Sequence, residues 1–309
     1  MMRPIDRLRA NIQSCFLGNQ PAIDRVVTCL LARGHILIED VPGVGKTTLA
    51  LALARSLDIE LSRIQMTPDL LPSDILGVNI WEPKHSAFVF KPGPIFANLV
   101  LADEVNRTTP RTQSALLEAM SESQVSLDGE THALPNPFLV IATQNPFEFE
   151  GTYFLPESQL DRFLMRINLG YPSPQDEARV LTIDPHRQAL ADLEPVMSAD
   201  ELRDLQSQVD DIQINPALID YVVALANATR RSDQLQLGVS PRGSLALVRA
   251  ARATALLQGR DYVVPDDITT HVVAVFGHRC ISKAQLQQAD QSSTQRILQG
   301  ILERIPTPN

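Results

Sequence analysis

The chain has 309 residues, of which 44% are hydrophobic and 20% charged, a composition that allows a sizeable buried core. Its net charge of −9 argues against a general attraction to nucleic acid or to anionic membrane surfaces. The three cysteines are scattered and odd in number, which favours buried thiols in a reducing compartment over a metal site or a disulfide framework. No apolar run approaches the roughly 18 residues of a membrane span, and the N-terminus lacks a secretory signal, so we expect a soluble cytoplasmic protein.

Strands and helices alternate through the first half of the chain. Residues 4–33 carry helical periodicity, and the β-branched run 35–40 ("HILIED") is typical of a buried strand. The Ala- and Leu-rich run 47–57 predicts a helix. Strands that are nearly all apolar and alternate with helices indicate an α/β fold, with a parallel sheet covered on both faces. The alternation continues with a strand over 97–104, a helix over 109–122 and a strand over 138–146.

Two segments interrupt this alternation, and a third marks a change of character. Residues 67–96 hold five prolines, too many for a regular helix, with "AFVF" as a candidate hairpin strand. Residues 124–137 alternate in polarity on both sides of an Asp-Gly turn, which predicts a hairpin. The Pro-rich run 171–177 is typical of a linker, and helical patterns follow it almost without a break. We therefore expect an α/β domain over residues 1–170 and a helical domain over 171–309.

The stretch 39–48, "EDVPGVGKTT", lies between a predicted strand and a predicted helix and matches a phosphate-binding loop. Its glycines allow successive N–H groups to converge on phosphate oxygens, and the following helix turns its positive end to the same anion. Lys46 is expected to reach the β- and γ-phosphates, and the Thr47 hydroxyl to bind Mg²⁺. The residues expected around the bound ATP are Pro42, Gly43, Val44, Gly45, Lys46, Thr47 and Thr48.

The strict form of this pattern has a glycine where the chain has Asp40. That position eases the opening turn and touches no phosphate, and aspartate tolerates unusual backbone angles better than most residues. We therefore expect Asp40 to be a mild departure that leaves ATP binding intact.

A second element supports the same interpretation. The apolar strand "LVLADE" ends in two adjacent carboxylates, Asp103 and Glu104. This arrangement suits an aspartate that organises Mg²⁺ and a glutamate that polarises the attacking water as general base. Acids at a strand end are a weak signal alone, because many face solvent, but they are a strong signal downstream of a phosphate loop.

Five stretches between residues 39 and 268 resemble the MoxR family of AAA+ ATPases. The resemblance covers most of the chain and is more specific than a generic pair of nucleotide-binding motifs. It implies a P-loop AAA+ core, a parallel sheet sandwiched by helices, followed by a small all-helical lid. The Pro-rich segment and the Asp-Gly hairpin match inserts of related machines. The stretches are "EDVPGVGKT", "RIQMTPDLLPSDILG", "LADEVNRTTPRTQSALLEAMSE", "VIATQNPFEFEGTYFLPESQLDRFLM" and "VSPRGSLALVRAARATALLQGRDYVVPDDI".

The resemblance also implies roles for single residues. Asn145 matches the sensor-1 residue, whose amide holds the attacking water or the γ-phosphate. Arg162 in "LDRF" matches the arginine finger, which stabilises transition-state charge at the neighbouring subunit's nucleotide, and Arg166 is a second candidate. Arg242 in "SPRG" matches the sensor-2 arginine, which contacts the γ-phosphate from the lid. The implied catalytic set is Glu104, Asn145, Arg162 and Arg242, with Mg²⁺ held by Thr47 and Asp103.

An arginine finger supplied to a neighbour implies a homo-oligomeric ring, and the resemblance points to a hexamer. It also implies a chaperone-like ATPase that remodels or activates partner complexes, often with a von Willebrand factor A domain protein as partner. Asn106 and Arg107 follow the paired acids. Their role is either in subunit contacts or in restraining Glu104, and the sequence does not choose between these alternatives.

Three other functions compete with this interpretation. One is a magnesium-chelatase-like motor subunit, which shares the same inserts. Another is a scaffold that binds ATP without turnover, but the chain retains every residue of the implied catalytic set. The third is a DNA-remodelling ring, which the hairpin tip "SLDGETH" disfavours because its two acids repel the phosphate backbone.

Overall fold

The structure is a computed structural model, which describes residues 2–146, 151–183, 190, 192–284 and 292–308. Residues 147–150, part of a stretch that carries the family resemblance, lie outside the described residues. Contacts divide the chain into two compact units. The first holds residues 1–26, 35–162 and 167–203, and the second holds residues 27–34, 163–166 and 204–309.

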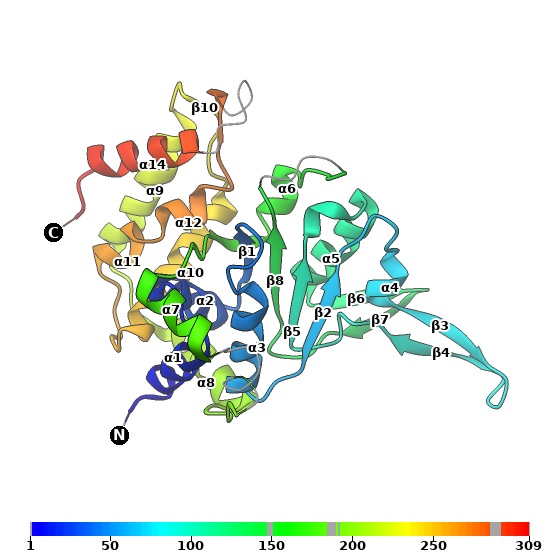
Figure 1. The fold of residues 1–309 in the computed structure, drawn as a ribbon. Helices are drawn as coiled ribbons and strands as arrows, with labels where there is room; N and C mark the ends of the chain where they lie inside the picture. The colour runs from blue at the N-terminus through cyan, green and yellow to red at the C-terminus, as the bar shows by residue number, and fades with distance from the viewer. Residues whose placement is uncertain (1, 147–150, 184–189, 191, 285–291, 309) are drawn as a thin grey trace. The chain divides into compact units, whose positions relative to one another are not determined.

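From its N-terminus to the last strand of the large sheet, the chain alternates helices and strands (Figure 1). The elements are α1 (Pro4–Cys15), α2 (Gln20–Leu31), β1 (His35–Glu39), α3 (Lys46–Ser56), β2 (Leu61–Gln65), α4 (Pro72–Leu76), β3 (Gly77–Glu82), β4 (Ala87–Pro92), β5 (Leu99–Asp103), the 3-10 turn η1 (Val105–Arg107), α5 (Pro110–Glu122), β6 (Gln124–Leu127), β7 (Glu130–Ala133), β8 (Leu139–Gln144), α6 (Glu157–Leu160) and β9 (Phe163–Ile167).

The remainder of the chain is mainly helical, as the sequence pattern predicts. Its elements are α7 (Pro174–Ile183), α8 (Ala199–Asp211), α9 (Pro216–Arg230), β10 (Leu235–Leu237), α10 (Pro241–Leu257), α11 (Pro265–Thr269), α12 (Val272–Phe276), β11 (Ile281–Ser282) and α14 (Ser292–Arg304).

The five-stranded sheet has the order β2-β5-β8-β1-β9, and its pairs β2–β5, β5–β8 and β8–β1 are parallel. Helices flank this sheet, so the predicted α/β fold class is confirmed (Figure 1). Strands β1 and β5 are buried along their whole length, and their side chains are apolar except for His35 and one terminal acid in each strand. In a parallel sheet the carboxyl ends of neighbouring strands share one edge, which is where ligand sites form.

The sequence pattern predicts three of these strands and misses β2 and β9. Strand β2 has the sequence "LSRIQ" and is only partly buried, so it lacks the continuous apolar run of an inner strand. The predicted linker 171–177 is partly wrong, because helix α7 begins at Pro174, a residue well suited to a first helical turn. The short strands β10 and β11, paired antiparallel, also carry no clear sequence signal.

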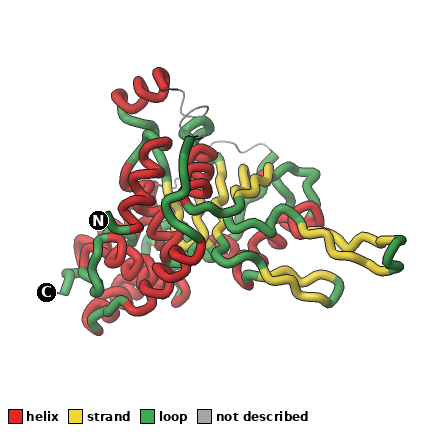
Figure 2. Tube along the Cα trace, turned by 90° about the horizontal axis from the view of Figure 1, so that it is seen from below, coloured by secondary structure: helices red, strands yellow, loops and turns green. Residues whose placement is uncertain are grey.

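Both predicted hairpins are present. Strands β3–β4 and β6–β7 form two antiparallel ribbons that lie side by side (Figures 1 and 2). The amide of Asn79 donates to the carboxylate of Asp128 at 2.7 Å. The ring of Phe90 stacks on His132 with 3.9 Å between centroids. Contacts at these two points join the ribbons into one projecting structure.

The predicted buried thiols are confirmed, since all three cysteines are buried and none forms a disulfide among the described residues. Burial raises the pKa of the Cys280 thiol to about 12, so this group is protonated and unreactive at neutral pH. In the second unit, α14 packs against α9 and α12. Among the described residues, every helix is too short or too polar to cross a membrane.

Candidate nucleotide site

The loop between strand β1 and helix α3 has the backbone of an anion-binding turn. Gly43 and Gly45 have φ values of 87° and 89°, in the left-handed region where a side chain would be strained. Gly45 is also the N-cap of α3 and provides no side-chain cap. The N-terminal end of the helix, with its positive partial charge, therefore follows the loop without an acidic or polar side-chain cap and suits an anion such as phosphate.

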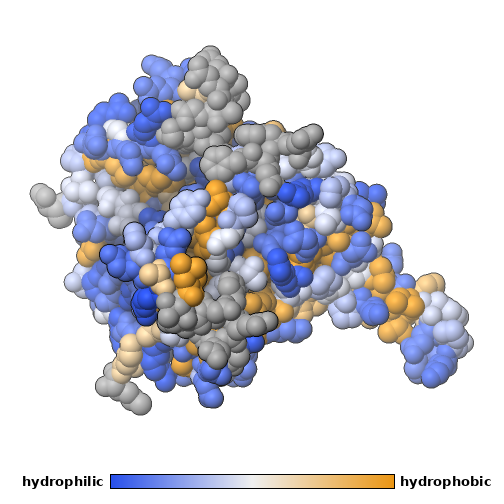
Figure 3. Space-filling view, viewed as in Figure 1, coloured by the Kyte–Doolittle hydropathy of each residue, from blue (hydrophilic) through white to orange (hydrophobic). Residues whose placement is uncertain are grey.

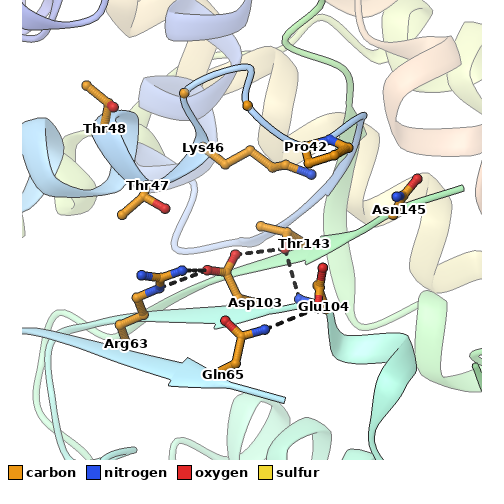
Figure 4. Close-up of a pocket in the computed structure, with 12 residues that line it drawn as sticks. Pro42, Lys46, Thr47, Thr48, Arg63, Gln65, Asp103, Glu104, Thr143 and Asn145 are labelled. Atoms are coloured by element: carbon orange, nitrogen blue, oxygen red, sulfur yellow. Dashed lines mark hydrogen bonds and ion pairs between the residues drawn. The ribbon is translucent and has the colours of Figure 1, made fainter. Parts of the chain in front are cut away.

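Lys46 is the first residue of helix α3, and its Nζ donates to the main-chain oxygen of Asp40 at 2.7 Å. The Thr47 side chain faces the strand end that carries Asp103 (Figure 4). Asp40 does not have a positive φ, so the expectation that it is tolerated for its unusual backbone angles is wrong. Its side chain is instead buried and bonded to main-chain N–H groups.

Asp103 ends strand β5 and is held by residues from both neighbouring strands. Arg63 on β2 donates from Nε to Asp103 Oδ2 at 2.8 Å, and Thr143 on β8 donates from Oγ1 to Asp103 Oδ1 at 3.0 Å (Figure 4). The strand order places Asp103 between these two partners. Its carboxylate is thus fixed in orientation and balanced by a guanidinium that is itself half-exposed.

Glu104 has a left-handed backbone, with φ 58° and ψ 53°, which is unusual for a residue with a side chain. Its N–H donates to Thr143 Oγ1 at 3.0 Å, which helps to hold this conformation. Its Oε2 atom accepts from Gln65 Nε2 at 3.2 Å and lies 3.1 Å from Arg107 Nε. A strained conformation is maintained only where the surroundings determine it, and such positions concentrate at functional sites.

These residues surround one cavity of about 260 Å³ (Figure 4). It brings together the phosphate loop, both strand-end acids and Asn145, which directly follows strand β8. Val44, also expected at the phosphates, is buried and outside the lining. The lining consists of Pro42, Gly43, Gly45, Lys46, Thr47, Thr48, Arg63, Gln65, Asp103, Glu104, Thr143 and Asn145.

Three lining residues have no predicted role: Arg63, Gln65 and Thr143. Arg63 and Gln65 are two apart in the stretch "RIQ", and alternate residues of a strand share one face. This alternation is a usable signal once β2 is recognised as a strand. Thr143 is a small hydroxyl residue in an apolar strand, and its bonds to both acids depend on strand order.

The oxygen donors of the cavity suit a hard divalent cation. The Thr47 hydroxyl and the Asp103 carboxylate line the same space as Lys46. Mg²⁺ is bound in nucleotide sites by one or two such oxygens, with water and phosphate oxygens completing its shell. The residues present therefore fit Mg²⁺ held by Thr47 and Asp103, and this role stays a prediction.

The two candidate arginine fingers have different surroundings. Arg162 donates from Nη1 to the main-chain oxygen of Leu117 at 2.6 Å and also to Ser121 Oγ, both on helix α5. Arg166 belongs to the second unit, where its Nη2 would lie 3.5 Å from a Cβ placed on Gly277. Arg166 thus packs against the end of α12, while Arg162 rests on the surface of the nucleotide-binding unit.

Arg242 lies in the first turn of helix α10, in the second unit. It is exposed, and the helix start is capped by Ser240, whose hydroxyl accepts from the N–H of Gly243 at 3.2 Å. Its role as a γ-phosphate contact stays a prediction.

Comparisons with known proteins identify the family of the chain. The profile of the ATPase family associated with various cellular activities (AAA) matches residues 35–165, and the AAA lid domain matches residues 227–301. A crystal structure of an ATPase candidate from Cytophaga hutchinsonii is 36% identical, with a TM-score of 0.90 over 99% of this chain and 95% of that one. The fold is that of an AAA ATPase.

Sequence relatives define the family more narrowly. The chain is 46% identical to the protein YeaC of Bacillus subtilis, over 96% of this chain and 93% of that protein. It is 40% identical to the chaperone MoxR1 of Mycobacterium tuberculosis, over 98% of this chain and 82% of that protein. The chain belongs to the MoxR family of AAA+ ATPases.

Proposed function

We propose that the protein hydrolyses ATP with Mg²⁺ in a ring oligomer and uses the energy to remodel or activate partner protein complexes. The observation that carries the proposal is the single cavity that gathers Lys46, Thr47, Asp103, Glu104 and Asn145. The chaperone-like role is supported by the relative MoxR1, which is named a chaperone. A von Willebrand factor A domain protein is the class of partner that we propose.

Several residues of the cavity have a chemical task in this proposal. The loop N–H groups and Lys46 bind the phosphates, and Asn145 orients the water near the γ-phosphate. Glu104 accepts a proton from that water as it attacks in line. Mg²⁺ held by Thr47 and Asp103 would neutralise phosphate charge. The half-exposed Arg63 guanidinium must share Asp103 with the cation.

The first test replaces Glu104 by glutamine, which keeps the size of the side chain and removes its basicity. Glu104→Gln should bind ATP as tightly as wild type and lose hydrolysis by at least about a hundredfold. Glu60→Gln is the matched control, since Glu60 is exposed and precedes strand β2 at the end remote from Gln65. Normal hydrolysis by Glu104→Gln would contradict the assignment of the general base.

The ring is tested by mixing two inactive variants. Lys46→Ala removes the phosphate contact from a subunit's own site, and Arg162→Ala removes the finger offered to its neighbour. If sites are shared, mixed rings regain part of the activity, and the specific activity of wild type rises with protein concentration. Arg166→Ala, measured in parallel, decides which arginine is the finger. A rate independent of concentration and of both arginines would contradict the ring.

The β3–β4 ribbon supports the proposed work on partner proteins. Apolar side chains gather on it, as Figure 3 shows. Trp81 and Phe88 pack edge to face across the two strands, yet remain 51% and 69% exposed. Exposed apolar groups of this size are typical of surfaces that contact other proteins. Ile80 and Val89, paired on the opposite face of the ribbon, are also exposed.

A further inference from the structure

Asp40 has a set of contacts that the phosphate-loop pattern does not explain. It directly follows strand β1 and is 9% exposed. Its Oδ1 accepts the N–H of Val41 at 2.9 Å, and its Oδ2 accepts the N–H groups of Leu169 and Gly170, both at 2.8 Å. Hydrogen bonds from main-chain N–H groups to a buried carboxylate are charge-assisted and stronger than neutral ones.

These bonds join two segments far apart in the sequence. Asp40 begins the phosphate loop, and residues 169–170 follow strand β9, 129 residues later in the chain. A second bond runs between the same segments, from the amide of Asn168 to the main-chain oxygen of Glu39. Gly170, whose N–H donates to the carboxylate, has a φ of 70°, a conformation that suits glycine.

The main chain of Asp40 also takes part in the site. Its carbonyl oxygen accepts the Nζ of Lys46 at 2.7 Å. A glycine here would keep this carbonyl but would lose the carboxylate, leaving the N–H groups of Leu169 and Gly170 without their acceptor. It would also give the backbone more freedom at the residue where the carbonyl must be aimed.

We propose that Asp40 is a positioning residue of the nucleotide site. Its carboxylate fixes the start of the phosphate loop against residues 169–170, and its carbonyl thereby holds Lys46 ready for phosphate. This role rests on the proposed function, because it acts through nucleotide binding. The glycine of the strict pattern is then the weaker choice for this chain, contrary to what the pattern alone predicts.

The test measures binding of AMP-PNP, a non-hydrolysable ATP analogue, with Mg²⁺ by titration calorimetry, together with thermal unfolding of each variant. Asp40→Gly restores the strict pattern, and Asp40→Asn keeps the size while it removes the charge. Each should raise the Kd about tenfold, as expected for lost charge-assisted hydrogen bonds. Asp74→Asn is the matched control, because Asp74 also accepts a main-chain N–H, that of Leu71 at 2.9 Å. It should change the Kd by less than about twofold.

A double-mutant cycle separates an effect that acts through Lys46 from a general structural effect of the substitution. In a Lys46→Ala background, Asp40→Asn should weaken binding by less than about twofold further, because the residue through which Asp40 acts is absent. An equal loss in both backgrounds would show a structural effect and overturn the proposal. So would wild-type or tighter binding by Asp40→Gly. If Asp40→Gly does not fold, the Kd of Asp40→Asn for AMP-PNP decides the test. Failure of the proposed function is distinct, since wild type itself would then not bind AMP-PNP.

Discussion

Arg107 forms an ion pair with Glu104 across the turn that follows strand β5, with 3.1 Å between Nε and Oε2. The N–H of Arg107 also donates to the main-chain oxygen of Glu104 at 2.8 Å. The same Oε2 atom accepts a bond from Gln65. One oxygen of the proposed general base is thus engaged by two side chains, which favours restraint of Glu104 over a subunit contact as the role of Arg107.

Removing this restraint should speed hydrolysis. We expect Arg107→Ala to raise the basal ATPase rate severalfold with little change in ATP affinity, because the freed carboxylate oxygen can accept a hydrogen bond from water. The rate and the Kd are measured on the same preparation. The exposed arginine of helix α1, replaced in Arg7→Ala, serves as the control.

A role of Arg107 in a subunit contact predicts a different change in rate and in assembly size. If it serves a subunit contact, Arg107→Ala lowers the rate, and sedimentation shows smaller assemblies at the same protein concentration. Gln65→Ala provides an independent check, because Gln65 reaches the same Oε2 atom from strand β2. A rise in rate for both variants, with assembly unchanged, is expected from restraint alone.

A second prediction concerns Arg63. Its guanidinium donates to the carboxylate of Asp103, which is the proposed ligand of Mg²⁺. A cation beside this carboxylate competes with Mg²⁺, so Arg63→Ala should lower the Mg²⁺ concentration needed for half-maximal ATP binding severalfold. The effect is modest because Arg63 is half-exposed and solvent screens the pair. Arg3→Ala removes another arginine–aspartate pair, Arg3–Asp6 at 2.8 Å, and should leave the Mg²⁺ dependence unchanged. A higher Mg²⁺ requirement would instead show that Arg63 orients Asp103 for the metal.

The phosphate loop is the part of the site that the sequence predicts best. Gly43, Gly45 and Lys46 act through local backbone geometry, so their spacing contains the information. The adjacent acids Asp103 and Glu104 are equally local. The fold class follows from the alternation of apolar strands with helices, which is a property of short segments.

The contacts of these residues are not predictable in the same way. Arg63 reaches Asp103 only because β2 lies beside β5, although the insert α4–β4 separates these strands in sequence. The partners of Asp40 lie 129 and 130 residues away. Such pairs depend on strand order and on loop closure, which the local sequence pattern does not specify. Strand β2 is missed for a different reason: its sequence is partly polar and gives no strand signal of its own.

A third prediction concerns the stability of the helical unit. Arg260 forms two bonds to the carboxylate of Asp267, at 2.8 and 2.7 Å, and Asp267 also accepts the N–H of Val264 at 2.9 Å. Hydrogen bonding to Asp267 raises the pKa of Arg260. Asp267 is 3% exposed, so Asp267→Ala leaves a partly buried guanidinium without its carboxylate partner and should lower the free energy of unfolding by about 3 kcal/mol.

Chemical denaturation measures this difference, and the exposed pair at the N-terminus supplies the comparison. Asp6→Ala breaks the Arg3–Asp6 pair and should cost less than about 1 kcal/mol. Equal losses for the two variants would show that burial does not set the strength of the Arg260–Asp267 pair.

The last prediction is a pH dependence of stability. His278 is 4% exposed, and its Nε2 lies 3.0 Å from the main-chain oxygen of Phe163. Burial, followed by the charges of Arg279 and Arg166, lowers the pKa of His278 well below its ordinary value of 6.5. The native state therefore keeps this imidazole neutral, whereas the unfolded chain takes up a proton below pH 6.5. Stability is unaffected above that pH and falls as the pH decreases toward the lowered pKa.

The slope contributed by one such group is at most about 1.4 kcal/mol for each pH unit. We expect the free energy of unfolding of wild type to fall between pH 6.5 and 5, and His278→Gln to remove most of that decrease. His85→Gln is the comparison, because the His85 side chain is 71% exposed whereas that of His278 is buried. A wild-type profile that is flat over this range would contradict the neutral state of His278, since a buried neutral imidazole must resist the protonation that the unfolded chain undergoes.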